Sequence, residues 1–276
     1  MTKMPKVRVK DIDIYYEVHG EGPPFLLIMG ADSTSKDWPQ SMLGFFGKHF
    51  TTIIFDNRGT GQTTVTVNGY TMRQMADDTA GLIEALNYPK VHVLGMSMGG
   101  MIAQELAINY PNKVDKLVLS CTHCGGPHHI QQPKDIQEQW RKTYDPPPEM
   151  TEEEIHEIRM SCLYASKFLE ENYDSFLEKR FPMELEPPPL HVRRGQRKGI
   201  DEIHDTYDRL PLIKAPTLIM HGEEDRVVPV ENGYLLNERI PDSRIVTFPE
   251  TGHIFAEAGA DFIGKIMEFL VPKQDE

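Results

Sequence analysis

The spacing of apolar and polar residues changes along this chain of 276 residues: one stretch alternates between the two, and later stretches are mainly apolar. Residues 6–20 alternate between apolar and polar positions, which predicts two strands that each bury one face. Later runs are mainly apolar, which is typical of strands buried on both faces; they are 24–30, 51–55, 91–95, 115–121, 216–220 and 244–248. Helical spacing follows most of them. This alternation predicts an α/β fold, with a mostly parallel sheet and helices on both faces.

Two of the helical stretches show where such helices should begin and end. In residues 71–86, apolar side chains recur every three or four positions, the spacing of one helix face. Thr71 precedes the first of them and is a suitable N-cap. The helix that follows residues 91–95 should end at Tyr110, because Pro111 cannot continue it.

The alternation stops in the middle of the chain. Residues 127–211 are polar, contain proline triplets at 146–148 and 187–189, and show helical periodicity but no strand-like run. We therefore assign residues 1–126 and 212–276 to the core and residues 127–211 to a helical cap, or lid, inserted over the carboxyl ends of the strands. The triplets are either rigid elbows or ordinary surface turns.

Aromatic residues and methionines are frequent in this cap. Such residues at helical spacing usually form a core, but a helical lid offers few other surfaces on which to bury them. Some should therefore face the substrate pocket, which predicts a partly apolar acyl or alcohol group in the substrate. The apolar set comprises Trp140, Tyr144, Met150, Met160, Leu163, Tyr164, Phe168, Tyr173, Phe176 and Phe181.

Composition and charge restrict the class of protein. With 39% hydrophobic residues the chain can bury one large core, and a net charge of −13 disfavours binding to nucleic acid and to anionic membrane surfaces. No run approaches the about 18 apolar residues of a membrane span. The N-terminal residues lack the apolar segment of a secretory signal, and the three cysteines fit a reducing compartment. We expect a cytoplasmic protein without membrane attachment.

A glycine-rich turn joins residues 91–95 to the helix that follows. Its sequence fits G-x-S-x-G, with Gly95 and Gly99 on either side of Ser97. A serine at so sharp a turn takes a strained backbone conformation, and small neighbours avoid collision with the adjacent strand and helix. The turn would hold the hydroxyl clear of the sheet, where the helix N-terminus favours developing negative charge. The alternative is a serine that merely caps the helix.

A serine nucleophile needs a base, and the base needs an acid that orients it. His253 lies in a glycine-containing loop after residues 244–248, and Asp225 follows residues 216–220. Taken singly, His253 would be a capping or solvated residue and Asp225 part of a solvated acidic turn. Together with Ser97, both follow strand ends, where ligand sites of parallel sheets lie, in the chain order Ser…Asp…His. The sequence therefore predicts a catalytic triad.

Motifs spread over nearly the whole chain resemble those of the α/β-hydrolase superfamily. They are "LLIMGAD" (26–32), "DNRGTGQT" (56–63), "GMSMGG" (95–100), "APTLIMHGEEDRVVP" (215–229) and "TGH" (251–253). Outside the insertion, the pattern is similar to that of small carboxylesterases, enol-lactonases and polyketide methylesterases. The resemblance implies a serine hydrolase that cleaves a small-molecule ester or lactone through an acyl-enzyme, with no cofactor and no metal.

The resemblance also implies an oxyanion hole made of the backbone N–H groups of Met98 and Ala31. Met29 and Gly30 stand where the family often has His-Gly before the second donor, but only backbone donors are needed. Haloalkane dehalogenases and epoxide hydrolases of this fold have a carboxylate at the elbow. Ser97 therefore argues against both activities.

Other functions are compatible with the same triad. An enol-lactonase, a methylesterase or a serine-dependent C–C bond hydrolase would use it, since the triad does not reveal the leaving group. Proline iminopeptidase is less favoured, because relatives of that type usually have Trp after the elbow serine, where Met98 stands here. A non-hydrolytic ligand receptor of this fold, cofactor-free oxygenation and cyanohydrin cleavage are further alternatives. A carboxylic-ester hydrolase is the leading hypothesis.

The stretch "CTHCGGPHH" (121–129) combines two cysteines with three histidines. The C-x-x-C spacing of Cys121 and Cys124 is also found in zinc and redox sites, but a zinc site needs ligands that converge from a rigid frame. We interpret the stretch as a loop from a strand to the cap, in which His128 or His129 could line the pocket.

Two further groups of polar residues are assigned structural roles. "RGTG" (58–61) lacks the Gly-Lys-Ser/Thr of a phosphate-binding loop and should form a tight turn. Arg226, Asp205 and Asp208 should tie the insertion to the sheet rather than take part in chemistry.

Overall fold

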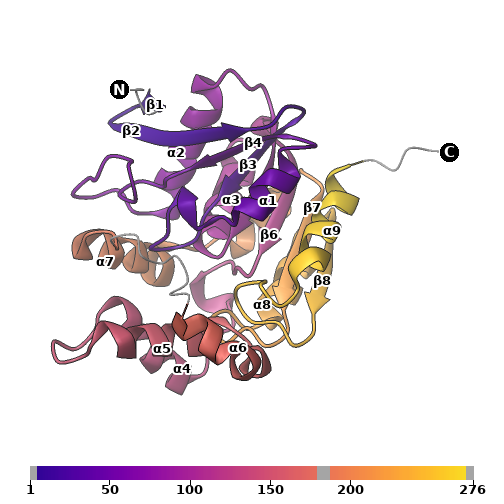
Figure 1. The fold of residues 1–276 in the computed structure, drawn as a ribbon. Coiled ribbons are helices and arrows are strands. Elements are labelled where there is room, and N and C mark those ends of the chain that lie inside the picture. Colours follow the sequence, from indigo (N-terminus) through magenta and orange to yellow (C-terminus); the bar gives the residue numbers. More distant parts are fainter. Residues whose placement is uncertain (1–4, 179–186, 272–276) are drawn as a thin grey trace.

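The strands of the described chain form one sheet in the order β1-β2-β4-β3-β5-β6-β7-β8 (Figure 1). The structure is a computed structural model that describes residues 5–178 and 187–271, without the side chains of residues 173–178. Phe181 and the rest of 179–186 in the expected cap therefore lie outside the described residues, as do the side chains of Tyr173 and Phe176. The strands are β1 (Lys6–Val9), β2 (Ile12–His19), β3 (Pro24–Ile28), β4 (Thr51–Phe55), β5 (Val91–Met96), β6 (Val114–Ser120), β7 (Thr217–Gly222) and β8 (Ser243–Phe248).

Because most of the strands are parallel, the loops that follow them lie together at the carboxyl end of the sheet. β1 and β2 form an antiparallel hairpin, and β2 is antiparallel to β4; all other neighbours are parallel. In register, Met96 pairs with Ser120, and Ser120 pairs with Met220. The carboxyl ends of β5, β6 and β7 are thus level, and the segments that follow them start side by side. The predicted α/β fold with a mostly parallel sheet is confirmed.

Helices cover both faces of the sheet. α2 (Met72–Ala85), α3 (Met98–Asn109) and α8 (Glu231–Arg239) share one hydrophobic cluster with the sheet, and α1 (Gln40–Phe46) and α9 (Gly259–Leu270) share another. None of the helices in the described ranges is long and apolar enough to cross a membrane.

β3 shows why the central strands are apolar at every position. Leu26 and Ile28 belong to the cluster with α2, α3 and α8, whereas Phe25 and Leu27 belong to the cluster with α1 and α9. Because side chains alternate between the two faces of a strand, a strand covered on both sides has no solvated position. Full burial of each such side chain contributes about 1.5–3 kcal/mol to the hydrophobic term.

The two predicted helix ends are confirmed. The N–H of Gln74 donates to Oγ1 of Thr71 (3.1 Å), which caps α2. α3 ends at Asn109 with Tyr110 as its C-cap, and Pro111 begins a short 3₁₀ turn. Side-chain capping and proline chemistry act over a few residues, so both ends are readable from the local sequence.

Between β6 and β7 the described chain is helical. It contains α4 (Lys134–Tyr144), α5 (Glu152–Leu163), α6 (Ser166–Glu178) and α7 (Leu190–Lys198), which continues into a π-helical turn, Gly199–Ile203. Figure 1 shows α4, α5 and α6 grouped below the sheet in that view. The described residues of this region form no strand, only an isolated bridge from Asp205 to Gly125.

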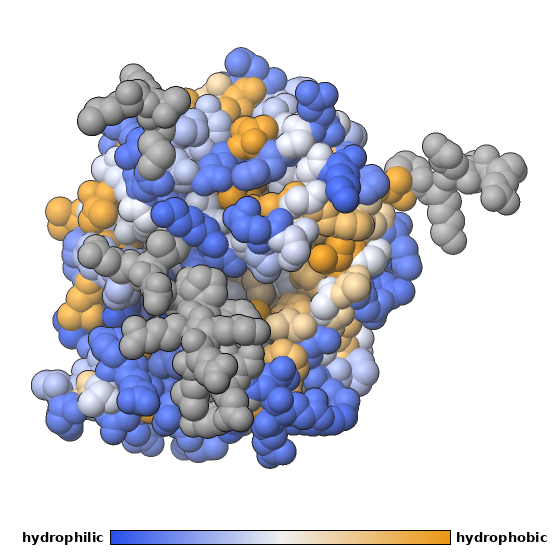
Figure 2. Space-filling model, in the orientation of Figure 1, coloured by the Kyte–Doolittle hydropathy of each residue, from blue (hydrophilic) through white to orange (hydrophobic). Residues whose placement is uncertain are grey.

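The α4–α6 group packs on the loop between β7 and α8. Figure 2 shows mainly hydrophilic residues on the visible outer face of the group. Its apolar residues turn inward and form a cluster with that loop, comprising Ile136, Met160, Cys162, Leu163, Tyr164, Val227 and Val228. Burial of this cluster joins the helices to the sheet, because apolar surface is removed from water on both sides.

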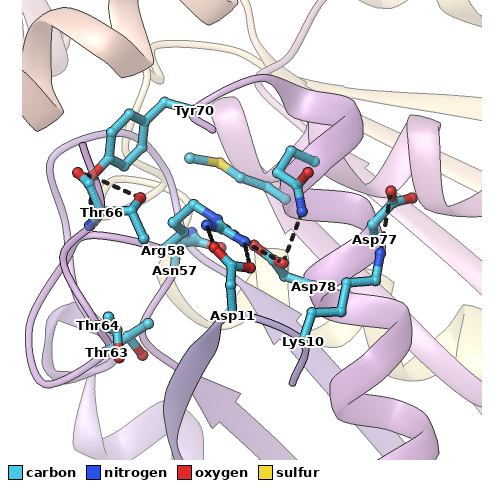
Figure 3. Close-up of polar contacts among 12 residues, drawn as sticks. Lys10, Asp11, Asn57, Arg58, Thr63, Thr64, Thr66, Tyr70, Asp77 and Asp78 are labelled. Atoms are coloured by element: carbon cyan, nitrogen blue, oxygen red, sulfur yellow. Dashed lines mark hydrogen bonds and ion pairs between the residues drawn. The ribbon is translucent and has the colours of Figure 1, made fainter. Parts of the chain in front are cut away.

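The loop after β4 is held by a buried arginine (Figure 3). Arg58 donates to both carboxylate oxygens of Asp78 (2.7 and 2.8 Å) and to both of Asp11 (2.9 and 3.0 Å). Hydrogen bonds from Arg58 lower the pKa of Asp11 to about 2. Gly59 and Gly61 have φ of 81° and 49°, values that favour glycine. The RGTG segment is therefore a structural turn, as predicted.

Candidate active site

Ser97 lies at a strained turn between β5 and α3. Its backbone has φ 54° and ψ −120°, a conformation that L-residues rarely adopt. A Cβ at Gly95 would lie 2.4 Å from the carbonyl oxygen of Gly99, and a Cβ at Gly99 would lie 2.0 Å from that of Ile28. Glycine at these two positions therefore lets β3, β5 and α3 approach closely enough to form the turn.

The Ser97 side chain does not cap α3. Ser97 occupies the N-cap position, but its hydroxyl makes no capping hydrogen bond. Its backbone instead joins the turn to the end of β6: the Ser97 N–H donates to the carbonyl of Ser120 (2.9 Å), and the Thr122 hydroxyl donates to the carbonyl of Ser97 (2.8 Å). The half-buried hydroxyl is left for another partner.

Three side chains from three loops form one hydrogen-bonded series. Oγ of Ser97 lies 3.0 Å from Nε2 of His253, and Nδ1 of His253 lies 2.8 Å from Oδ2 of Asp225. A neutral imidazole that donates from Nδ1 to Asp225 has a free lone pair on Nε2, which can accept the Ser97 proton. The structure therefore brings together the three side chains named from the sequence.

Asp225 is a buried carboxylate that stays ionised. Burial alone raises its pKa, but the charge of His253 and hydrogen bonds from His221 and His253 lower it to about 2. Its other oxygen, Oδ1, accepts the backbone N–H groups of Val227 (2.9 Å) and Val228 (2.8 Å). The acid is thus oriented by its own loop.

Sequence reasoning missed two contacts of this series. His221 is buried at the end of β7, where Nε2 lies 2.8 Å from the Val228 carbonyl and 3.5 Å from Oδ2 of Asp225. Its place four residues before Asp225 was a usable signal, since His221 lies near the end of β7 and Asp225 follows that strand. The N–H of His253 donates to the carbonyl of Leu163 (2.8 Å), at the end of α5. No local pattern marks that second contact.

The predicted oxyanion donors lie on either side of this turn. Met98 is the first residue of α3, and the Ala31 loop passes close by, because a Cβ at Gly30 would lie 3.4 Å from Cβ of Ser97. Within the described residues, the N–H groups of Met98 and Ala31 have no hydrogen-bond acceptor. The N–H of Asp32, by contrast, donates to Oε1 of Gln196 (2.9 Å).

Residues of α7 form hydrogen bonds with Asp32, which follows Ala31. Asp32 has a left-handed backbone, with φ 61°, and its carboxylate accepts a hydrogen bond from Arg197 (3.1 Å). Its N–H is held by Gln196, whose side chain is fully buried. Asp32 is therefore fixed through both backbone and side chain by the helix before β7.

The cysteine-histidine stretch after β6 forms a folded loop. Cys121 and Cys124 are buried thiols; burial raises the pKa of Cys124 to about 12 and that of Cys121 well above its ordinary value. Protonated buried thiols are poor nucleophiles and metal ligands. Over the described ranges, no three His, Cys, Asp or Glu side chains are grouped so as to hold a metal ion. His128 stacks on Tyr207, with centroids 3.8 Å apart.

We expected three residues to connect the insertion to the sheet, and their contacts differ: they are Arg226, Asp205 and Asp208. Arg226 donates to the carbonyl of Ser161 in α5 (3.1 Å), as predicted. Asp205 contributes its backbone to the bridge with Gly125, while its carboxylate accepts the N–H of the nearby Tyr207 (3.2 Å). The prediction for Asp208 is wrong, because this exposed carboxylate reaches no partner among the described residues.

Residues 23–260 match the protein family described as "alpha/beta hydrolase fold". The chain belongs to the α/β-hydrolase superfamily. A relative, the 2-hydroxy-6-oxo-6-phenylhexa-2,4-dienoate hydrolase of Comamonas testosteroni, is 28% identical over 98% of this chain and 96% of its own.

Solved structures agree with this membership. A thermophilic esterase from Thermogutta terrifontis is 28% identical, with a TM-score of 0.78 over 96% of this chain and 98% of its own. An α/β hydrolase enzyme from a Medee basin deep-sea metagenome library has a TM-score of 0.85 at 24% identity, over 99% of both chains, and supports the fold alone. Family and relatives together support a hydrolase that acts on small molecules.

Proposed function

We propose that this protein is a carboxylic-ester hydrolase that cleaves a small-molecule ester or lactone through an acyl-enzyme on Ser97. The observation that carries the proposal is the hydrogen-bonded series from Ser97 through His253 to Asp225. The strained turn supports it further, because such strain is stored where a side chain must be presented in one direction. The esterase relative at 28% identity adds support for the substrate class.

In the proposed reaction, His253 takes the Ser97 proton through Nε2 as Oγ attacks the carbonyl carbon. The imidazolium that forms is stabilised by the ionised Asp225, which also keeps the other ring proton on Nδ1. His253 then protonates the leaving group, and a water that it activates releases the acyl group. Every proton transfer uses a side chain of this chain, so we propose no cofactor and no metal.

We assign the oxyanion hole to the N–H groups of Met98 and Ala31. Negative charge on the carbonyl oxygen develops only as Ser97 attacks, so donors fixed beforehand stabilise the transition state more than the substrate. Each such donor contributes about 3 kcal/mol. The helix N-terminus at Met98 adds a favourable electrostatic potential.

We further propose that residues 127–211 act as a cap over this site. Contacts of α5 with His253 and of α7 with Asp32 support this assignment. The many aromatic and methionine side chains of the segment lead us to propose a partly apolar substrate. Three free, buried cysteines fit the proposed location in the cytoplasm.

The variant Ser97→Ala tests the proposal. Hydrolysis of p-nitrophenyl acetate and butyrate should fall at least about 10⁴-fold in kcat, and labelling by an organophosphonate should disappear. The matched control is Ser41→Ala, which removes an exposed hydroxyl from α1 and should leave both unchanged. Normal turnover by Ser97→Ala would remove the proposal, and labelling without turnover of any ester would favour a receptor.

A second candidate is C–C bond hydrolysis on the same residues. It is favoured by the relative from Comamonas testosteroni, whose named substrate contains no ester group, so that its hydrolysis must break a C–C bond. The same assay can include that dienoate. A higher kcat/KM on the dienoate than on every ester and lactone would make this the primary activity.

A further inference from the structure

A buried histidine lies next to the proposed active site and has no part in the reaction described above. His123 follows the end of β6, and β6 lies between β5, which leads to Ser97, and β7, which leads to Asp225. Its neighbour Thr122 is hydrogen-bonded to the carbonyl of Ser97 (2.8 Å). His123 therefore leaves the sheet between the loops of the nucleophile and the acid.

The contacts of the His123 ring determine which nitrogen carries the proton. The backbone N–H of Gly125 donates to Nδ1 (3.0 Å), so Nδ1 acts as an acceptor and the neutral ring has its proton on Nε2. Burial, together with four neighbouring histidines that include His221 and His253, holds the pKa of His123 well below its usual range. The ring is thus a neutral N–H donor at physiological pH.

The ring of His123 is held in place. It stacks on His129, with centroids 4.6 Å apart and planes at 19°, and lies against His204. Its backbone carbonyl accepts hydrogen bonds from Nε2 of Gln104 (3.0 Å) and from the ring of His204 (3.3 Å). A donor fixed in this way loses little conformational entropy when it binds a ligand.

The donor itself is unused within the protein. His123 is only 9% exposed, and Nε2 has no hydrogen-bond partner among the described residues. Among the described residues, Nε2 of His123 is not one of the unpaired side-chain atoms that are fully enclosed. A buried donor without a partner is costly unless water or a ligand satisfies it.

We propose that His123 is a specificity-determining residue that donates its Nε2–H to an oxygen of the substrate other than the scissile carbonyl. The ring offers a hydrogen bond but no positive charge to offset a buried anion, so the acceptor that it fits best is an uncharged one, a keto or ether oxygen. The inference rests on the proposed hydrolase function and narrows its substrate class to esters or lactones with such a second oxygen. A substrate without that oxygen leaves the donor unsatisfied.

Two variants separate this role from a purely structural one. His123→Asn places an acceptor near the position of Nδ1 for the Gly125 N–H but removes the Nε2 donor. His123→Gln extends an amide N–H toward the position of Nε2 but removes the Nδ1 acceptor. A binding role predicts greater loss in His123→Asn, whereas a role in anchoring the loop predicts greater loss in His123→Gln.

Matched substrates then provide the readout. p-Nitrophenyl methoxyacetate has an ether oxygen where p-nitrophenyl butyrate has a methylene, and 2-methoxyethyl butyrate differs from butyl butyrate in the same way on the alcohol side. In one pair, His123→Asn should lower kcat/KM for the ether-containing ester about tenfold more than for its partner, and His123→Gln should restore part of that preference. The affected pair shows which side of the substrate His123 contacts.

Organophosphonate labelling of Ser97 in each variant shows whether the reacting groups are intact. If the labelled variants lose activity equally on both members of every pair, or lose none, His123 is not a specificity residue. If His123→Asn does not fold, His123→Gln still decides, because preserved preference supports the proposal and equal loss on all four esters overturns it. If the wild-type protein cleaves none of the esters, the proposed function itself fails and the inference fails with it.

Discussion

The loops at the carboxyl edge of the sheet and the helices between β6 and β7 hold the site in different ways. Ser97 is positioned by glycines two residues away, and Asp225 by N–H groups two and three residues away. These arrangements are local in the chain. They follow from backbone geometry that a short motif can specify.

The helical segment acts over long distances in the chain. Leu163 at the end of α5 accepts the N–H of His253, and Gln196 in α7 accepts the N–H of Asp32, 164 positions away. Neither contact supplies a reacting group. Under the proposed function, the core supplies the reacting groups, and the helical segment positions groups next to them.

The largest expected effect tests the core loops, whose side chains are positioned by residues nearby in the chain. Asp225→Asn keeps the shape of the side chain but removes the acceptor that keeps the His253 proton on Nδ1. The kcat on p-nitrophenyl butyrate should fall about 10⁴-fold at pH 7. Glu224→Gln, a change at the exposed neighbour, should have no effect. A loss below tenfold in Asp225→Asn would mean that the acid is not part of the series.

Gly99→Ala tests the packing that creates the turn. The new Cβ would lie 2.0 Å from the Ile28 carbonyl oxygen, so β3 or α3 must move, and the free energy of unfolding should drop by about 3 kcal/mol. Gly264→Ala in α9 is the matched control, since open space surrounds that position. It should stabilise the protein by about 0.5–1 kcal/mol. Equal urea midpoints for the two variants would contradict this interpretation.

The pH dependence of stability tests whether Asp225 is a buried carboxylate that is stabilised in its ionised form. Its pKa is lowered from 3.8 to about 2 on folding, so its contribution is present above about pH 4 and is lost as the pH falls toward 2. The shift corresponds to about 2 kcal/mol. Urea unfolding should therefore show a steeper loss of stability between pH 4 and 2 in the wild type than in Asp225→Asn. Parallel curves would show that Asp225 has no such shift.

The smallest expected effect tests the helical segment, whose contacts with the core loops are distant in the chain. Gln196→Met removes the acceptor of the Asp32 N–H while keeping the length of the side chain, so the loop that carries Ala31 loses one anchor. The kcat should fall about tenfold with little change in stability of the sheet. The control on the same helix is Arg194→Gln, an exposed position. An effect of Gln196→Met on KM alone would assign α7 to substrate binding instead.

Much of the fold could be predicted because its signals are short. The strand over Thr51–Phe55, the cap at Thr71 and the turn at Arg58–Gly61 each depend on neighbouring residues. Asp208 shows the limit of such reasoning. Its charge pattern indicated a contact with the sheet, but whether a surface carboxylate meets a partner depends on how its segment packs.

The residues of the candidate site also fall into two groups, those that short sequence motifs reveal and those that depend on packing. The chain order Ser…Asp…His, the position of each residue after a predicted strand and the glycines around Ser97 were enough to name Ser97, Asp225 and His253, because parallel strands bring their following loops to one end of the sheet. The place of His123 beside them depended on its contacts with Gly125 and with other histidines, which no spacing reveals.

The amino-acid sequence by itself determined the alternation of strands and helices, the strained serine turn and the identity of the three side chains in series. Those features follow from periodicity, glycine sterics and the chain order of residues that follow strands, which act over a few residues or through a known topology. Only the tertiary structure decided that α5 and α7 hold His253 and Asp32, and that His123 keeps an unused donor beside the site. Such contacts depend on how helices dock, and docking is the sum of many weak interactions between residues distant in the chain.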